Sequence, residues 1–222
     1  MKRRMTRISA ENLACFRGGR LVFRGLAFSV VPGGALLLTG TNGSGKSSLL
    51  RILAGLLEPF DGSVLADGLP LDRGTRADHA ARTAYIGHQD ALKPTLTVEE
   101  TVEFWSALAL GGDRAMSCDK ALAALNLSDL APVRVQYLSS GQRRRLALTR
   151  LLVSGADLWL MDEPTVGLDT ASVALVEDMV ARHRDAGGTA ILSTHIEFRL
   201  GGASTLDLGD FAPVPMTLEA AS

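Results

Sequence analysis

A glycine-rich segment directly after the apolar run 35–39 carries residue types suited to hold a phosphate group. It has the pattern G-x-x-x-x-G-K-[ST], followed by one more serine. Glycines let the backbone turn tightly and point successive N–H groups inward, and the start of a following helix adds the positive end of its dipole. The pattern therefore predicts a phosphate-binding loop made of Gly40, Thr41, Asn42, Gly43, Ser44, Gly45, Lys46, Ser47 and Ser48.

Two side chains of this loop can take part in chemistry. Lys46 can reach the β- and γ-phosphates of a nucleoside triphosphate, and the hydroxyl of Ser47 can ligate Mg²⁺. The alternative is a glycine-rich turn that merely contains a lysine, but the complete pattern between a strand and a helix argues against it. We therefore expect a nucleotide and Mg²⁺ at this loop.

Two adjacent carboxylates follow a second apolar run, at residues 158–161. In a parallel sheet, ligands bind at the carboxyl ends of the strands, which is where Asp162 and Glu163 would lie. Asp162 is expected to hold Mg²⁺ directly or through water, and Glu163 to polarise the attacking water as a general base. A solvated acidic turn is a comparable interpretation for the pair alone, and the phosphate loop upstream favours the catalytic one.

The spacing of apolar residues predicts the elements that position these groups. Alternating apolar residues predict short antiparallel strands over 8–31, and short apolar runs predict strands buried on both faces. Further strands are expected at 35–39, 63–66, 83–86, 158–161 and 189–193, and helices at 47–57 and 171–184. This order predicts an α/β fold: a P-loop NTPase core with an N-terminal antiparallel β subdomain.

The middle of the chain has a helical pattern instead. Thr97 and Glu100 have the spacing of a capping box, which predicts a helix that starts at Thr97 and runs to Gly111-Gly112. Two more helices are predicted at 119–127 and 139–152. We predict an inserted α-helical subdomain over about residues 93–153, within a single domain that spans residues 1–222.

Composition narrows the class of protein. The chain has 222 residues, 46% of them apolar, and its 23 Lys and Arg nearly balance 24 Asp and Glu, so no nucleic-acid partner is expected. Cys15 and Cys118 lie far apart and lack metal-ligand spacing, which indicates reduced cysteines. The sequence has no apolar run long enough to span a bilayer and no secretory pattern, so attachment to a membrane is expected only through partners.

Four shorter motifs complete a recognisable order. Gln89 stands alone between the two main motifs, the segment 138–142 (LSSGQ) precedes the third helix of the insertion, and 167–169 (GLD) and 193–195 (STH) follow the carboxylates. Together with the phosphate loop and the acidic pair, this order resembles the ATP-binding cassette (ABC) ATPases over nearly the whole chain.

The resemblance implies a role for each motif. Gln89 matches the Q-loop residue that reaches Mg²⁺ and senses a membrane partner, Asp169 the D-loop aspartate at a dimer seam, and His195 the switch histidine that contacts the γ-phosphate. The signature residues that contact the γ-phosphate bound to the other subunit are matched by Ser139, Gly141 and Gln142. Hydrolysis in this family needs two chains, head to tail, with two ATP molecules between them.

The chain departs from the family pattern in two places. Ser140 stands where the signature usually has glycine, and a small residue there still fits. The family stacks adenine on an aromatic residue upstream of the phosphate loop. Phe16 is the nearest aromatic candidate, but a gapless comparison places Arg17 there, and a guanidinium plane can also stack on a base. The sequence leaves both residues open.

Three kinds of ABC protein fit this order of motifs. A soluble protein acting on nucleic acid or ribosomes usually has two cassettes, coiled-coil insertions or a basic surface, none of which is present. A switch that does not hydrolyse ATP is disfavoured because Glu163 and His195 are both present. The sequence therefore favours a motor subunit for membrane-spanning permease subunits, peripheral on the cytoplasmic face of the bacterial inner membrane.

A finer resemblance points to one transport system. The stretch 85–93 (YIGHQDALK), the early segment 15–20 (CFRGGR) and the short tail after His195 are similar to the CcmA family, the ATP-binding subunits of bacterial cytochrome c maturation. The resemblance implies that ATP hydrolysis powers haem export or release of a haem chaperone. Another small ABC exporter is the alternative. His88 has no second ligand nearby in the sequence, so no direct haem binding is expected.

Overall fold

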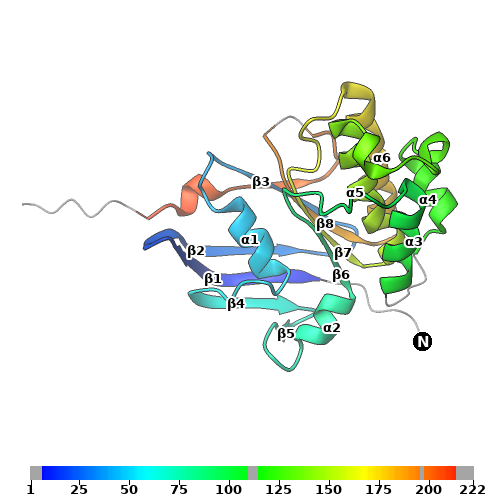
Figure 1. Cartoon of the computed structure of the whole chain (residues 1–222). Helices are drawn as coiled ribbons and strands as arrows, with labels where there is room; N and C mark the ends of the chain where they lie inside the picture. The colour runs from blue at the N-terminus through cyan, green and yellow to red at the C-terminus, as the bar shows by residue number, and fades with distance from the viewer. Residues whose placement is uncertain (1–6, 110–114, 196–197, 214–222) are drawn as a thin grey trace, which may run out of the picture.

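The fold contains two β-sheets of different character, shown in Figure 1. The computed structural model describes residues 7–109, 115–195 and 198–213. The first sheet is antiparallel, with strand order β2-β1-β4-β5. Its strands are β1 (Ile8–Arg17), β2 (Arg20–Val30), β4 (Asp61–Ala66) and β5 (Leu69–Pro70). The N-terminal antiparallel subdomain predicted from the alternating pattern is confirmed.

The second sheet is parallel throughout, with strand order β6-β7-β8-β3-β9. Its strands are β3 (Ala35–Thr39), β6 (Thr83–Ile86), β7 (Leu158–Asp162), β8 (Thr189–Ser193) and β9 (Ser204–Asp207). Because the strands run in one direction, the phosphate loop after β3, the carboxylates at the end of β7 and the STH segment after β8 all leave the same edge of the sheet. β9 was not predicted, since its residues are mostly exposed and carry no buried alternation.

Both faces of the parallel sheet are buried, which explains its continuous apolar runs. Leu158 and Leu160 of β7 pack into one core, and Trp159 and Met161 into the other. The first core lies between the two sheets and contains helix α1 (Lys46–Leu53).

The second core is covered by helices on the opposite face. They are α3 (Val98–Leu108), α4 (Cys118–Ala124), α5 (Ser140–Ser154) and α6 (Thr170–Asp185). Shorter elements are α2 (Arg76–Ala81), η1 (Ser128–Leu130), η2 (Val135–Tyr137) and η3 (Leu208–Phe211). Within 93–109 and 115–153 every named element is helical, in keeping with the predicted insertion, whose boundaries stay a prediction.

Two helix predictions needed correction at their ends. α1 stops at Leu53 rather than residue 57, because Ala54 caps it and Gly55 turns into the left-handed region at φ 71°. α4 covers Cys118–Ala124 instead of 119–127. The capping box of α3 is confirmed, since Thr97 Oγ1 accepts from Glu100 N and Glu100 Oε2 accepts from Thr97 N. The end predicted at Gly111-Gly112 lies outside the described residues.

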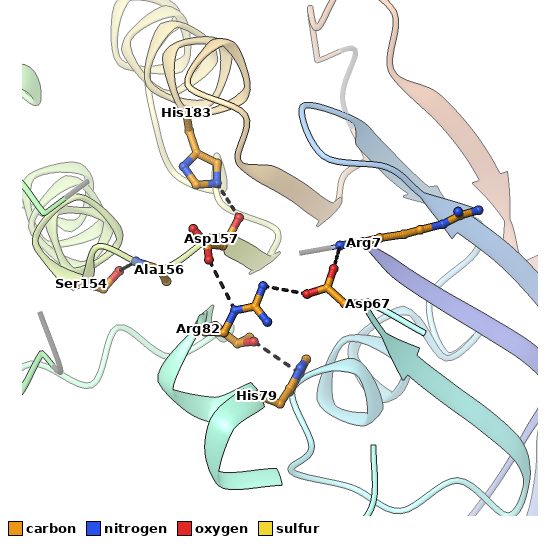
Figure 2. A network of polar contacts seen from close by, with 9 residues as sticks. Arg7, Asp67, His79, Arg82, Ser154, Ala156, Asp157 and His183 are labelled. Atoms are coloured by element: carbon orange, nitrogen blue, oxygen red, sulfur yellow. Dashed lines mark hydrogen bonds and ion pairs between the residues drawn. The ribbon is translucent and has the colours of Figure 1, made fainter. Parts of the chain in front are cut away.

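A polar network joins the two sheets (Figure 2). Arg82, just before β6, donates to Asp67 of the antiparallel sheet at 2.8 Å and pairs with Asp157, at the start of β7, at 3.4 Å. Asp157 is only 1% exposed. Asp67 also accepts from the backbone N–H of Arg7 at 2.7 Å. These partly buried ion pairs link the antiparallel sheet to the edge of the parallel sheet opposite the phosphate loop.

Among the described residues, no helix combines the length and the apolar character needed to cross a bilayer.

Candidate active site

The phosphate loop is shaped by its own lysine. Lys46 is the first residue of α1 and only 6% exposed, and its Nζ donates to Gly40 O at 2.7 Å and to Thr41 O at 3.2 Å. The side chain thus folds back across the loop, and its positive charge lies beside the helix N-terminus. This arrangement concentrates positive potential where a polyphosphate would enter.

The glycines of the loop are required by its geometry. Gly45 has φ 106°, and a Cβ there would lie 2.7 Å from Val22 Cγ1 and 2.8 Å from Phe23 Cδ1. Gly40 has φ 121°. In the part of the chain that the structure describes, the buried Ser44 Oγ has no hydrogen-bond partner. A backbone cradle with a buried hydroxyl still to be satisfied fits the oxygens of a phosphate.

Asp162 and Glu163 leave the end of β7 and are oriented by β8. Ser193 Oγ donates to Asp162 Oδ1 at 2.8 Å and accepts from Glu163 N at 2.9 Å. Asp162 is 3% exposed, whereas the side chain of Glu163 is 23% exposed. Glu163 has φ 49°, a left-handed conformation that a non-glycine residue adopts only under external restraint. The strand end therefore buries one carboxylate and turns the other outward.

His195 lies next to Glu163. Its Nε2 is 3.0 Å from Glu163 Oε1, and its side chain is 41% exposed. His195, two residues after β8, thereby contacts Glu163, the residue after β7, at the edge where parallel strands end together. A base and a histidine at hydrogen-bond distance, open to solvent, can both approach a water and a phosphate at this edge.

A cavity of about 370 Å³ joins the loop to this carboxylate. The described residues that line it are Arg17, Gly18, Arg20, Val22, Asn42, Gly43, Gly45, Lys46, Ser47, Ser48 and Glu163. Phe16 is not in that lining. Its ring, 48% exposed, lies instead 5.6 Å from the ring of Phe60. Of the two residues that the sequence left open for adenine, Arg17 is the one on the cavity wall.

The signature residues are organised separately from this cavity. Ser139 is the N-cap of α5, where its Oγ accepts from Gln142 N at 3.2 Å while Gln142 Oε1 accepts from Ser139 N at 2.8 Å. The hydroxyl of Ser139 keeps its own proton for donation to an anion. Ser140 is the first helical residue and adopts this capped start without a glycine. None of the described residues that line the phosphate-loop cavity comes from segment 138–142.

The start of α5 lies against the D-loop of the same chain. A Cβ on Gly141 would be 3.3 Å from Gly167 O, so the two backbones approach closely. Asp169 caps α6 by accepting from Ser172 N at 2.8 Å, and the hydrogen bonds from Ser172 hold the pKa of Asp169 below its usual value. The signature and D-loop residues therefore form one exposed surface, apart from their own phosphate loop.

Gln89 is exposed, but the residues around it are anchored. Gly87 O and Asp90 Oδ1 both accept from Arg144 of α5, at 3.2 and 2.8 Å. Arg144 and Ser193 were not predicted as site residues. Ser193 could have been suggested by its place in the STH segment, whereas Arg144 carries no local signal beyond its position in a basic helix.

The oxygen donors near the phosphate loop suit Mg²⁺, although few of them are carboxylates. No cluster of three or more His, Cys, Asp or Glu side chains within the described ranges could hold a metal ion. Mg²⁺ needs no such cluster at a nucleotide, because it takes one or two protein oxygens, waters and phosphate oxygens. Ser47 on the cavity wall and the buried carboxylate of Asp162 are oxygen donors of the kind required.

The parallel sheet, the phosphate loop, the paired Glu163 and His195 and the capped signature helix define an ATPase of the ATP-binding cassette class, and the family model "ABC transporter" matches residues 23–166. A cytochrome c biogenesis ATP-binding export protein CcmA from Paramagnetospirillum magneticum is 52% identical over 208 residues, which are 92% of this chain and 94% of that protein. Its namesake from Rhodospirillum rubrum is 49% identical over 207 residues, 93% and 88% of the two chains. The chain belongs to the CcmA family of ABC ATPases.

A solved structure is similar in fold. A putative ABC transporter ATP-binding protein from Pyrococcus furiosus superposes with a TM-score of 0.79 at 19% identity, covering 93% of this chain and 100% of that one. The fold class predicted from the motifs is thereby confirmed.

Proposed function

We propose that this ATPase works as a head-to-tail pair of identical chains, with each ATP held by the phosphate loop of one copy and Ser139 of the other. The observation that supports it is the separation of the two elements: Ser139 starts α5 away from its own phosphate-loop cavity, yet offers a hydroxyl at a helix N-terminus. Gly141, Gln142 and Asp169 would lie in the same seam between the copies.

Within one site, the residues divide the work of phosphoryl transfer. Lys46 and the loop N–H groups stabilise the β- and γ-phosphates, and Glu163 accepts a proton from the attacking water. His195 gives up its contact with Glu163 and contacts the γ-phosphate instead. Mg²⁺, held by Ser47, Asp162 and Gln89, would neutralise charge on the phosphate oxygens. Arg17 on the cavity wall is the proposed contact for adenine.

A hollow beside β6, the strand that leads into the Q-loop, suits a membrane partner. A cavity of about 610 Å³ lies between β6 and α3, with Tyr85, Leu56, Phe104 and Leu108 in its lining. Leu56, Phe104 and Leu108 are 66, 54 and 64% exposed, which is unusual for large apolar side chains on one surface. We propose that permease subunits dock here and hold the chain at the cytoplasmic face of the inner membrane.

The system served is cytochrome c maturation. This proposal rests on relatives named cytochrome c biogenesis ATP-binding export proteins that match over nearly the full length of both chains. ATP hydrolysis would power haem export or release of a haem chaperone, with haem handled by the membrane partners rather than by this chain.

Two measurements test these steps. A deletion strain should lose c-type cytochromes and keep b-type ones, and a plasmid carrying Glu163→Gln should fail to restore them. Purified with its membrane partners, the Glu163→Gln protein should bind ATP, form a stable closed dimer and lose hydrolysis by about a hundredfold or more. Intact c-type cytochromes in the deletion strain would leave only the alternative function, that of an ATP-binding subunit of another small ABC exporter. Rapid ATP hydrolysis by Glu163→Gln would reject Glu163 as the general base.

A further inference from the structure

Arg144 sits on the second turn of α5 and reaches the end of the catalytic strand. Its side chain is buried, with 6% exposure. Nη2 donates to Asp162 O and Glu163 O, both at 2.8 Å, and Nε donates to Pro164 O at 3.1 Å. One side chain thus holds three consecutive carbonyls of the segment that carries the two carboxylates.

The same guanidinium also reaches the Q-loop. Nη1 donates to Gly87 O at 3.2 Å and to Asp90 Oδ1 at 2.8 Å, so both sides of Gln89 are tied to α5. An arginine side chain has five N–H donors, and Arg144 makes five hydrogen bonds with them. The carboxylate of Asp90 supplies the opposite charge that a buried cation needs.

We propose that Arg144 is a positioning residue that locks the Q-loop and the Asp162-Glu163 segment to the signature helix. Glu163 needs such a restraint because it has a left-handed φ of 49°. Ser193 Oγ holds its N–H and Arg144 holds its carbonyl, so the peptide groups on both sides of its Cα are fixed. The direction of the Glu163 carboxylate then depends on Arg144.

The lock has a consequence for the pair of sites, which rests on the dimer proposed above. Ser139 and Arg144 belong to the same helix, five residues apart in the chain. Ser139 serves the nucleotide of the other copy, whereas Glu163 serves the nucleotide of its own. Arg144 therefore links the signature contact at one site to the base and the Q-loop at the other.

The chemistry of the contact requires an arginine. Lysine has three donors on one nitrogen and cannot reach three carbonyls of one segment and two acceptors of another in a planar fan. Glutamine has two donors and no charge for Asp90. Activity should therefore fall in the order arginine, lysine, glutamine at position 144.

The test compares Arg144→Lys and Arg144→Gln with Arg145→Lys, in the full chain purified with its membrane partners. Arg145 is a matched control, because its Nη1 donates to Leu125 O and Asn126 O and not to the catalytic segment or the Q-loop. Arg144→Lys should lower kcat about tenfold, and Arg144→Gln further, while the Kd of a fluorescent ATP analogue changes less than about twofold. Arg145→Lys should leave kcat within about twofold of the unmodified protein.

A double-mutant cycle with Asp90→Asn separates positioning from folding. Asp90→Asn should lower kcat about threefold, and adding it to Arg144→Gln should cause little further loss, because Arg144→Gln has already removed the contact that Asp90→Asn breaks. Independent, multiplicative losses would overturn the proposal, as would an unchanged kcat in Arg144→Lys or a loss that only follows the melting temperature. Hydrolysis by the unmodified protein and its loss in Glu163→Gln check the proposed function separately from Arg144.

Discussion

The phosphate loop and the start of α5 both present donors to an anion, but they are built in opposite ways. The loop is closed by contacts within seven residues, from Gly40 to Lys46, and its shape depends on glycine backbone. The start of α5 is closed by an ordinary capping box between Ser139 and Gln142, which any helix with a serine N-cap and a Glu or Gln three residues later could form.

Under the proposed dimer, this difference corresponds to the part of each site that one chain supplies. The loop shares a cavity with Glu163 of the same chain, whereas the start of α5 faces the D-loop of its own chain. A helix N-terminus with an available hydroxyl is of little use to its own nucleotide in that place. In the dimer proposed above, one chain supplies the phosphate loop and Glu163 to one site and the donors at the start of α5 to the other.

The largest effect is expected from removing the charge at the centre of the loop. Lys46→Ala should abolish hydrolysis, a loss of more than about a hundredfold, because the transferred phosphate loses its cation and Gly40 O and Thr41 O lose their donor. ATP binding should weaken as well. Steady-state hydrolysis and fluorescent-nucleotide titration measure the two effects, and near-normal turnover would show that the loop is not the catalytic half.

Mixing two inactive variants tests whether the halves come from different chains. Ser139→Arg should block the γ-phosphate contact made to the other copy, so this variant and Lys46→Ala should each be inactive alone. In a mixed dimer, one site pairs the intact Lys46 with the intact Ser139, and the other carries both defects. An equal mixture should therefore regain about a quarter of the normal activity, since half of the dimers are mixed and each has one working site.

The control for that mixture is each variant reassembled with itself under the same conditions. No recovery in the mixture would mean that Ser139 acts on the nucleotide of its own chain, and the comparison between the two regions would fail. Full activity of Ser139→Arg alone would show that the signature helix takes no part in hydrolysis.

The sequence predicted the features that consecutive residues form and missed those that depend on tertiary structure. The strands at 35–39, 83–86 and 189–193 were predicted with the observed bounds, because a buried strand is a continuous apolar run. The phosphate loop was predicted whole, because its residues are consecutive. β9 and α2 were missed, since exposed residues dominate both elements.

The spacing of residues in the sequence did not predict contacts between residues far apart in the chain. Arg144 bonds to Gly87, 57 positions away, and Ser193 to Asp162, 31 positions away, and neither pairing follows from spacing. The roles given to Gln89, Ser139, Asp169 and His195 came from the family order of motifs. Within one chain, the structure adds the helix caps made by Ser139 and Asp169 and the contact of His195 with Glu163.

A smaller effect is expected at the adenine end of the cavity. Arg17→Ala should raise the KM for ATP about threefold to tenfold and leave kcat nearly unchanged, because a stacking contact far from the γ-phosphate contributes equally in ground and transition states. Phe16→Ala is the matched control, because the neighbouring Phe16 packs against Phe60 outside the cavity. If Phe16→Ala instead raised KM more than Arg17→Ala, the aromatic residue would be the adenine contact.

The smallest effect concerns the far end of α1, where stability rather than catalysis should respond. His79 Nε2 lies 2.7 Å from the carbonyl oxygen of Leu53, the last residue of the helix that Lys46 begins. Burial lowers the pKa of His79, and the charge of Arg82 lowers it further, although the hydrogen bond to Leu53 opposes both. The folded protein thus takes up a proton at His79 less readily than the unfolded chain.

The sign of the pH effect follows from that difference. Stability from a neutral His79 is fully present above the pKa of the unfolded histidine, about 6.5, and is lost as the pH falls from there towards the lower pKa of the folded state. His79→Gln keeps a donor for Leu53 O and cannot be protonated, so its melting temperature should fall by a few degrees less than that of the unmodified protein between pH 7 and pH 5. If the melting temperature of His79→Gln changed with pH as much as that of the unmodified protein, the C-terminal end of α1 would not depend on a neutral His79. The phosphate loop would then be held only by contacts at the N-terminal end of α1.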